Sequence, residues 1–312
     1  MALKNSTLFV AATFFWLLMA EGALRIFYNP RHLSINENVM GSAAFRYDVR
    51  LGWFPVDGSK GSFAASRVIS YSHNSMGLRE DEAIDSSKPI ILFIGDSFTW
   101  GFDVNQYERF TELLKVRLPN YTIVNAGVNG YGTDQQFLLL QALESKLDPA
   151  LVFLLYYGEN DRVDNSTNQR HGGFYKPYFL QDGDSLKLEG VPVPKGERYF
   201  FAEHSGLANI YLLRLGVKAW FKGRSPAKIY NPDPTKALLI QIAQYLDDRG
   251  VNFMMGAQSP DEAFLRLTDS LQVPFVDLSN EYRYKTYGGH WTPKGHEMVA
   301  DSIELLFKSH FR

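Results

Sequence analysis

The sequence of 312 residues contains no cysteine. Such a chain forms no disulfide and has no cysteine for lipoprotein acylation, and this composition fits an exported protein. Neither sign of charge is in large excess, because 32 basic residues stand against 34 acidic ones and give a net charge of -2. The composition therefore excludes a disulfide-stapled scaffold and gives no indication of a nucleic-acid partner.

An uncharged apolar run from Asn5 to Ala20 follows Lys4 near the N-terminus. Sixteen helical residues rise about 24 Å, which is short of a hydrocarbon core of about 30 Å. A helix extended to Phe27 is long enough to span, if Glu21 pairs with Arg25 one turn further on. Because the run is hydrophobic all round, a buried core helix is the weaker interpretation.

A cleaved signal peptide has the same charged start and short apolar middle. In this chain, however, Leu18-Met19-Ala20 is a poor small-x-small cleavage site. We therefore predict that residues 1–28 form an uncleaved membrane anchor. The rest of the chain is then expected on the extracytoplasmic side, in the periplasm or outside the cell.

After the anchor, the pattern predicts one sizeable core with additions. Residues 29–87 mix short alternating stretches with turn signals and predict a small strand-rich extension. From residue 88 to 312, strand and helix patterns alternate, which predicts an α/β domain built on a doubly wound parallel sheet. The expected elements are helices over Tyr107–Leu118, Thr133 to about Ser145, Lys236–Asp248 and Pro293–Phe307, and a strand over Val251–Met255. We expect Thr133 and Gln136 to form a capping box.

Residues 162–235 interrupt this alternation and are too long for an ordinary connection of about four to six residues. We predict a lid or a substrate wall there. Its aromatic residues either line a sugar- or acyl-binding surface or cover the sheet, and they are Phe174, Tyr175, Tyr178, Phe179, Tyr199, Phe200 and Phe201. Within it, Leu207–Lys222 predicts a basic amphipathic helix, which either lies on an anionic membrane surface or, as we favour, packs with a solvated basic face.

Four separated segments carry the residues suited to chemistry. Gly95-Asp96-Ser97-Phe98 ends the apolar run from Pro89, where a buried strand gives way to a loop. The tripeptide Gly-Asp-Ser is a weak signal alone, and it gains weight from three segments further along the chain. These are Asn125 to Thr133, Gly158-Glu159-Asn160-Asp161 and His290 to His296, each at the end of a predicted strand or the start of a helix. Open parallel sheets place their chemistry at such strand ends.

This set of four segments resembles the SGNH (GDSL) hydrolase family, over roughly residues 88 to 312. The resemblance implies a flavodoxin-like fold and an acyl-ester substrate, carried by a small molecule or a polymer, with no cofactor. It makes Ser97 the nucleophile, Gly130 and Asn160 the oxyanion donors, and His290 the general base. Two short segments also look like the lead-in found in membrane-anchored members of the family: Leu51-Gly52-Trp53 and Asn74-Ser75-Met76-Gly77-Leu78-Arg79.

The chemistry of these residues fits those roles independently. A tetrahedral oxyanion is stabilised by preorganised N–H donors. Gly130 offers a backbone N–H without a side chain in the way, and Asn160 offers two side-chain N–H groups. A serine hydroxyl such as that of Ser97 needs a neighbouring base, and His290 can take its proton.

One position departs from the family pattern. The family has an aspartate three residues before the histidine, where it orients the imidazole, but this chain has Tyr287 there. Losing that carboxylate can cost about ten-thousandfold in rate unless another group replaces it. Asp277, at the end of a strand-like segment, is our first candidate for the replacement, and Glu281 is the second.

Other interpretations of the same segments are weaker. The turn from Gly127 to Gly132 lacks the G-x-G-x-x-G spacing of a dinucleotide site. His296 is expected to be a structural or surface histidine, and the remaining histidines show no metal-ligand spacing. We therefore predict an extracytoplasmic, membrane-anchored serine ester hydrolase. The alternatives are an O-acyltransferase acting on a polysaccharide or lipid, and a binding module of the same fold that has lost turnover.

Overall fold

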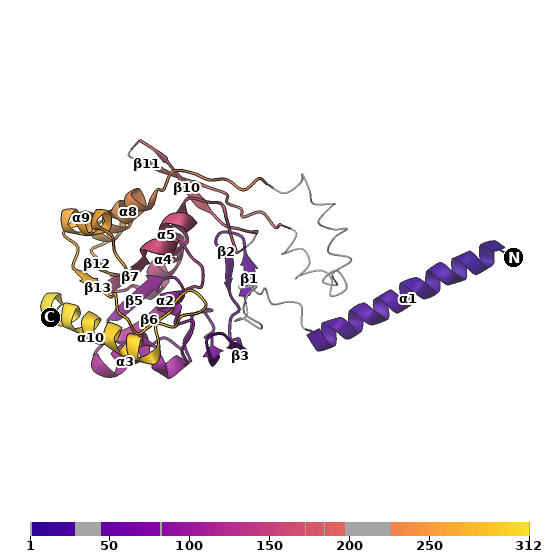
Figure 1. Ribbon diagram of the computed structural model, residues 1–312, viewed down its shortest axis with the longest axis horizontal. Coiled ribbons are helices and arrows are strands. Elements are labelled where there is room, and N and C mark those ends of the chain that lie inside the picture. Colours follow the sequence, from indigo (N-terminus) through magenta and orange to yellow (C-terminus); the bar gives the residue numbers. More distant parts are fainter. Residues whose placement is uncertain are drawn as a thin grey trace. The chain divides into compact units, whose positions relative to one another are not determined.

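The computed structural model describes residues 2–28, 45–81, 83–171, 173–183, 185–196 and 226–311. The chain divides into two units, Met1–Leu33 with Pro194–Ala227 and Ser34–Val193 with Lys228–Arg312, and each is described by itself. The described helix of the first unit is α1 (Ala2–Tyr28) (Figure 1). Its segment Ser6–Ala23 has a mean hydropathy of 1.4 and is not buried. By length and composition α1 can cross a membrane, and a signal sequence has the same properties.

The second unit is built on a five-stranded parallel sheet. Its strands are β5 (Ile90–Gly95), β6 (Thr122–Gly127), β7 (Leu151–Tyr157), β12 (Asn252–Gln258) and β13 (Phe275–Asp277). They lie in the order β13-β12-β7-β5-β6, which by chain order is the 2-1-3-4-5 arrangement of flavodoxin-like sheets. Both β5 and β7 are buried over their whole length, as apolar strands covered on both faces must be. The predicted fold class is confirmed.

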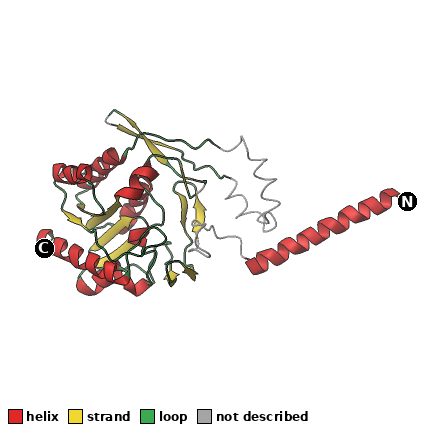
Figure 2. Cartoon of the chain, in the orientation of Figure 1, coloured by secondary structure: helices red, strands yellow, loops and turns green. Residues whose placement is uncertain are grey.

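Helices cover both faces of this sheet (Figure 2). On one face, α3 (Phe110–Arg117) and α10 (Pro293–His310) pack against the strands, and Phe93, Phe110 and Ile303 share one buried core. On the other face lie α4 (Thr133–Leu147) and α8 (Thr235–Asp247), with α9 (Glu262–Leu271) beside α8. The start of α10 is fixed by Thr292, whose hydroxyl accepts the N–H of Gly295, and by a proline at the first helical position.

One local expectation is confirmed only in part, and another is wrong. The helix expected over Tyr107–Leu118 is a short 3-10 turn, η1 (Gln106–Glu108), followed by α3, because Arg109 between them has an extended backbone. The capping box expected at Thr133 is absent, since Gly132 is the N-cap of α4 and makes no side-chain cap. The Gln136 amide donates instead to Tyr131 O and Asp161 Oδ1.

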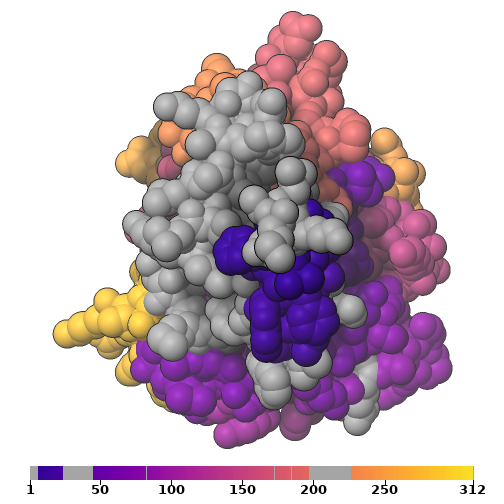
Figure 3. All heavy atoms as spheres, turned by 90° about the vertical axis from the view of Figure 1, so that its right-hand side faces the viewer, coloured from indigo at the N-terminus to yellow at the C-terminus, as the bar shows by residue number. Residues whose placement is uncertain are grey.

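The segment before the sheet contains two antiparallel hairpins. β1 (Phe45–Asp48) pairs with β2 (Gly52–Pro55), and β3 (Lys60–Ala64) pairs with β4 (Val68–Ser72). The described part of the later insertion is also strand-rich, because β8 (Gln169–Arg170) pairs with β9 (Phe174–Tyr175), and β10 (Tyr178–Asp182) pairs with β11 (Ser185–Glu189). The β10–β11 hairpin stands out from the surface of its unit (Figure 3).

The insertion predicted as a lid or substrate wall, residues 162–235, is described by the structure only in part. Its role as a lid stays a prediction. Arg162, its predicted first residue, lies inside helix α5 (Gly158–Asn165). Phe174, Tyr175 and Phe179 are buried, which favours the interpretation that they cover the core. The predicted helix Leu207–Lys222 and the aromatics from Tyr199 to Phe201 lie outside the described residues.

Candidate active site

Ser97 begins a single helical turn, α2 (Ser97–Trp100), directly after β5. Asp96 caps this turn, because its Oδ1 accepts the N–H of Phe98 at 2.9 Å. Gly101 ends the turn in the left-handed conformation with φ 83°. Strand β5 lies beside β7, where the strand order reverses, and this is the place at which open α/β sheets bind ligands.

His290 lies against Ser97 although 193 positions separate them in the chain. The distance from Ser97 Oγ to His290 Nε2 is 2.8 Å, and both side chains are buried. The imidazole packs between Phe98 and Phe102, with ring centroids 4.9 Å away in each case. The structure therefore brings together the two residues predicted as nucleophile and base.

The carboxylate that faces His290 belongs to Asp103. Its Oδ2 lies 3.2 Å from His290 Nδ1, and its side chain is fully buried. A carboxylate only accepts hydrogen bonds, so Nδ1 carries the proton and Nε2 is left to accept the Ser97 hydroxyl. This corrects the expectation that Asp277 or Glu281 orients the histidine. Asp277 is exposed at the end of β13 and accepts the N–H of Ser279 at 2.8 Å.

The backbone before His290 explains why position 287 does not supply the acid. Tyr287, Gly288 and Gly289 have φ values of 50°, 88° and 67°, so three successive residues are left-handed. A Cβ at Gly288 would lie 3.2 Å from His290 Cε1. The chain thus passes directly beside the imidazole, and Tyr287 remains 39% exposed.

The loop that carries Asp103 is held by residues from the segment before the sheet. The backbone N–H of Ser66, between β3 and β4, donates to Asp103 Oδ1 at 3.0 Å. The buried guanidinium of Arg79 donates to the carbonyls of Gly101 and, at 2.8 Å, of Val104, on either side of Asp103. Sequence analysis missed Asp103, because the shortness of α2 and the left-handed turn at Gly101, which bring it to His290, leave no clear pattern in the sequence.

We propose the N–H groups of Ser97, Gly130 and Asn160 as the donors that stabilise an oxyanion. The Asn160 side chain, in the first turn of α5, donates one N–H to Asp96 Oδ2 at 3.3 Å, which leaves its second N–H. Among the described residues, neither the backbone N–H of Ser97 nor that of Gly130 donates a hydrogen bond. Gly130 has φ 74°, and a Cβ there would overlap the imidazole of His171. A glycine is therefore required at this turn.

Buried carboxyl groups lie next to these donors. Burial raises the pKa of Asp96 and, together with the nearby Asp96 carboxylate, raises the pKa of Asp161 well above its usual range. Asp161 Oδ2 accepts the N–H of Tyr157 at 2.8 Å, which fixes the start of α5 and so the position of Asn160. Burial also raises the pKa of Asp164 to about 7, although Arg170 Nη1 lies 2.5 Å from its Oδ1.

We predict that Asp164→Asn removes one component of the pH dependence of stability. An unfolded aspartate has a pKa of about 3.9, so between about pH 4 and pH 7 the folded chain holds a proton that the unfolded chain has released. The free energy of unfolding therefore falls as the pH rises, and the Asp164 contribution is complete only below about pH 4. The wild type should lose roughly 3 kcal/mol relative to the variant between about pH 4 and pH 8. Urea unfolding across this range measures the difference, and a constant difference would contradict the prediction.

His296 is a structural residue. It is fully buried, its Nδ1 accepts the N–H of Phe110 at 3.2 Å, and its ring stacks on the Phe110 ring. Burial, with Arg109 and Arg79 nearby, lowers the pKa of His296 well below its usual range. No cluster of metal-ligating side chains occurs in the part of the chain that the structure describes.

Residues 93–181 match the model of the GDSL-like lipase/acylhydrolase family. Over this segment, which runs from β5 into β10, the chain is similar to the family. The match indicates a hydrolase that acts on ester bonds. The search of curated proteins finds no match for this GDSL-like hydrolase.

Solved structures with a similar arrangement are distant. TesA has 15% identity and a TM-score of 0.42, over 70% of this chain and 98% of TesA. The psychrotrophic esterase EstA from Pseudoalteromonas sp. has 11% identity and a TM-score of 0.41, over 71% and 98% of the two chains. The acetyl xylan esterase AlAXEase has 14% identity and a TM-score of 0.40, over 69% and 97%. At these TM-scores the three structures carry no weight for the activity of this GDSL-like hydrolase.

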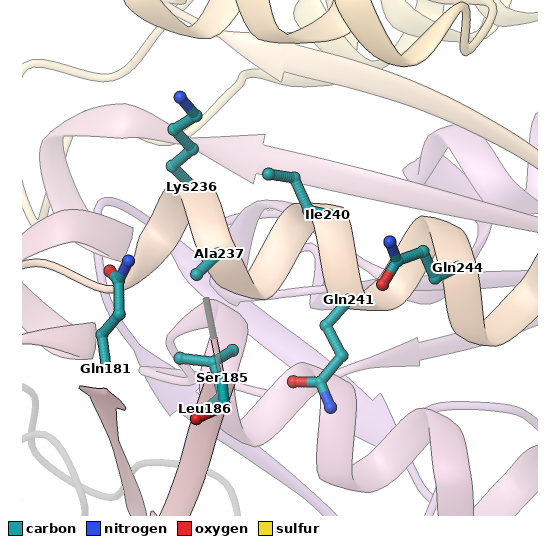
Figure 4. A pocket seen from close by; sticks show the side chains of 8 residues that line it. All are labelled: Gln181, Ser185, Leu186, Lys236, Ala237, Ile240, Gln241 and Gln244. Carbon is teal, nitrogen blue, oxygen red and sulfur yellow. The ribbon is translucent and has the colours of Figure 1, made fainter. Parts of the chain in front are cut away.

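A separate cavity of about 610 Å³ lies between the β10–β11 hairpin and α8 (Figure 4). Its lining residues are Gln181, Ser185, Leu186, Lys236, Ala237, Ile240, Gln241 and Gln244. Neither Ser97 nor His290 is among these residues, so the cavity is a different site from the one that holds the serine and the histidine.

Proposed function

We propose that this hydrolase is anchored in a membrane by α1 and cleaves acyl or acetyl esters outside the cytoplasm through a covalent acyl-serine intermediate. The observation that carries the proposal is the continuous contact from Ser97 Oγ to His290 Nε2 at 2.8 Å and from His290 Nδ1 to Asp103 Oδ2 at 3.2 Å. Acyl transfer by a serine needs a nucleophile that contacts a base, and a base that contacts an orienting acid.

The reaction follows from this order of groups. As Ser97 Oγ attacks the ester carbonyl carbon, its proton passes to His290 Nε2, and Asp103 stabilises the imidazolium that forms. The N–H groups of Ser97, Gly130 and Asn160 stabilise the negative oxygen of the tetrahedral intermediate. His290 then gives the proton to the departing alcohol, leaving the acyl group on Ser97. Water, deprotonated by His290, attacks that acyl group and releases the acid and the free serine.

Two alternatives bear on this proposal. The binding-module interpretation depended on the missing carboxylate at position 287, and Asp103 supplies a carboxylate at His290. An acyltransferase uses the same acyl-serine and differs only in the acceptor, an alcohol in place of water. Substrates for the first assays are therefore short-chain nitrophenyl esters, acetylated polysaccharides and lipid esters.

The membrane part of the proposal is supported by the exposed apolar side chains of α1. Leu8, Phe9 and Trp16 are 74%, 74% and 69% exposed, and a helix of 27 residues has a length of about 40 Å. That length exceeds a hydrocarbon core of about 30 Å. The absence of cysteine is consistent with an extracytoplasmic location.

One labelling experiment tests both parts. We expect a membrane-impermeant fluorophosphonate to label the full chain in intact spheroplasts, because Ser97 is activated and lies on the outer side. The label should be absent in Ser97→Ala, which keeps the fold. Labelling only after lysis would place the site in the cytoplasm, and a folded wild type that never labels would favour the binding module.

A further inference from the structure

Trp53, in the first N-terminal hairpin, contacts the turn that carries Gly130. Its side chain is fully buried, and its indole Nε1–H donates to the carbonyl oxygen of Asn129 at 3.0 Å. This carbonyl and the N–H of Gly130 belong to the same peptide unit. Because a trans peptide is planar and its C=O and N–H point in opposite directions, fixing the oxygen also fixes the direction of the Gly130 N–H.

The hairpin itself is tied to the same turn. The hydroxyl of Tyr131 donates to Trp53 O, and the Gln135 amide donates to Leu51 O at 2.7 Å. The Tyr131 ring meets the Trp53 ring edge-on, with centroids 5.6 Å apart. The indole is therefore held rigidly, and it cannot swing away from Asn129 without breaking these contacts.

A residue of the insertion also contacts this turn. His171, from the insertion, packs edge-on against Trp53 with ring centroids 5.8 Å apart, and its imidazole lies against Gly130. The Asn129–Gly130 turn is thus contacted by two residues, Trp53 and His171, that are remote in sequence.

We propose that Trp53 is a positioning residue for the oxyanion hole: its indole N–H sets and polarises the Asn129–Gly130 peptide so that the Gly130 N–H meets the developing oxyanion. The inference rests on the proposed function, in which Gly130 is an oxyanion donor. A donor bonded to the carbonyl of an amide also strengthens the N–H at the other end as a donor. Trp53 lies outside the segment that matches the family, residues 93–181, so the N-terminal extension supplies part of the catalytic geometry.

The test removes a single N–H from the full chain in detergent. Trp53 is replaced by benzothienylalanine, whose sulfur takes the place of the N–H in a ring of nearly the same shape, and Trp53→Phe serves as a second variant. The matched control is the same replacement at Trp100, an equally buried indole whose Nε1 has no hydrogen-bond partner among the described residues. Activity is measured as kcat per active serine, counted by fluorophosphonate titration.

We expect kcat to fall about tenfold, with KM nearly unchanged. Losing an oxyanion donor completely lowers kcat roughly 10²- to 10³-fold, and the loss of the Trp53 N–H should cost less because the Gly130 N–H remains. Affinity for a trifluoromethyl ketone, a mimic of the tetrahedral intermediate, should fall by a similar factor. The replacement at Trp100 should leave kcat and the affinity for the ketone at their wild-type values. A purely structural role would lower thermal stability and leave kcat per active serine unchanged.

The outcomes separate the inference from the proposed function. An active wild type whose Trp53 variants keep kcat and ketone affinity would overturn the role of Trp53 alone. Equal losses in the Trp53 and Trp100 variants would overturn it too, since they would show a general packing effect. A folded wild type with neither ester turnover nor serine labelling would overturn the proposed function, and the inference with it.

Discussion

Replacing His290 by alanine is expected to lower kcat for ester hydrolysis by about 10⁴-fold or more, because Ser97 then has no base within reach. The distance of 2.8 Å from Ser97 Oγ to His290 Nε2 leaves no room for an intervening group. Steady-state kinetics with a nitrophenyl ester measures the loss. Added imidazole should restore part of the rate, since it can occupy the space that the side chain leaves.

His296→Ala is the matched control for this change. His296 is just as buried but accepts a hydrogen bond from the Phe110 backbone and does not contact Ser97. Its loss should lower the free energy of unfolding by about 1–3 kcal/mol, while kcat per labelled serine stays within a few-fold of the wild type. Equal losses of kcat in the two variants would show that the base is misassigned.

Asp103→Asn is expected to lower kcat by about 10³- to 10⁴-fold. The substitution keeps the shape of the side chain, but an amide that donates to Nδ1 favours the tautomer with its proton on Nε2. In that tautomer His290 cannot accept the Ser97 proton. KM should change little, because Asp103 is fully buried behind the imidazole and does not contact the ester.

The control for Asp103 is Asp277→Asn, which alters the residue that sequence analysis selected. Asp277 is exposed, and among the described residues its carboxylate accepts only the nearby Ser279 N–H, so we expect kcat within about twofold of the wild type. Kinetics with the same ester compares the two variants. The reverse result, a large loss in Asp277→Asn and none in Asp103→Asn, would contradict the assignment of the acid.

The sheet and the position of Ser97 were predictable because their signals are local. Strands such as β5 and β7, buried on both faces, appear in sequence as continuous apolar runs, and the end of such a run in an α/β pattern marks the crevice. The resemblance of the four segments to the SGNH (GDSL) hydrolase family then indicated which residues converge.

The parts that could not be predicted depend on backbone conformation and on distant contacts. Asp103 reaches His290 because α2 is only four residues long and Gly101 turns the chain back. The contact of Trp53 with Asn129 joins residues 76 positions apart and leaves no periodic pattern in either segment. The failure of the capping box at Thr133 has a similar cause, since Asn165, from another helix, accepts the N–H of Asp134 at 3.1 Å.

The structure of the chain after phosphonylation is the most direct measurement of the whole account. We predict that phosphorus is bonded to Ser97 Oγ, with its oxygen within hydrogen-bond distance of the N–H groups of Ser97, Gly130 and Asn160. The His290 imidazole should remain in contact with Asp103. Phosphorus on another residue, or an oxygen that faces away from Gly130 and Asn160, would contradict it.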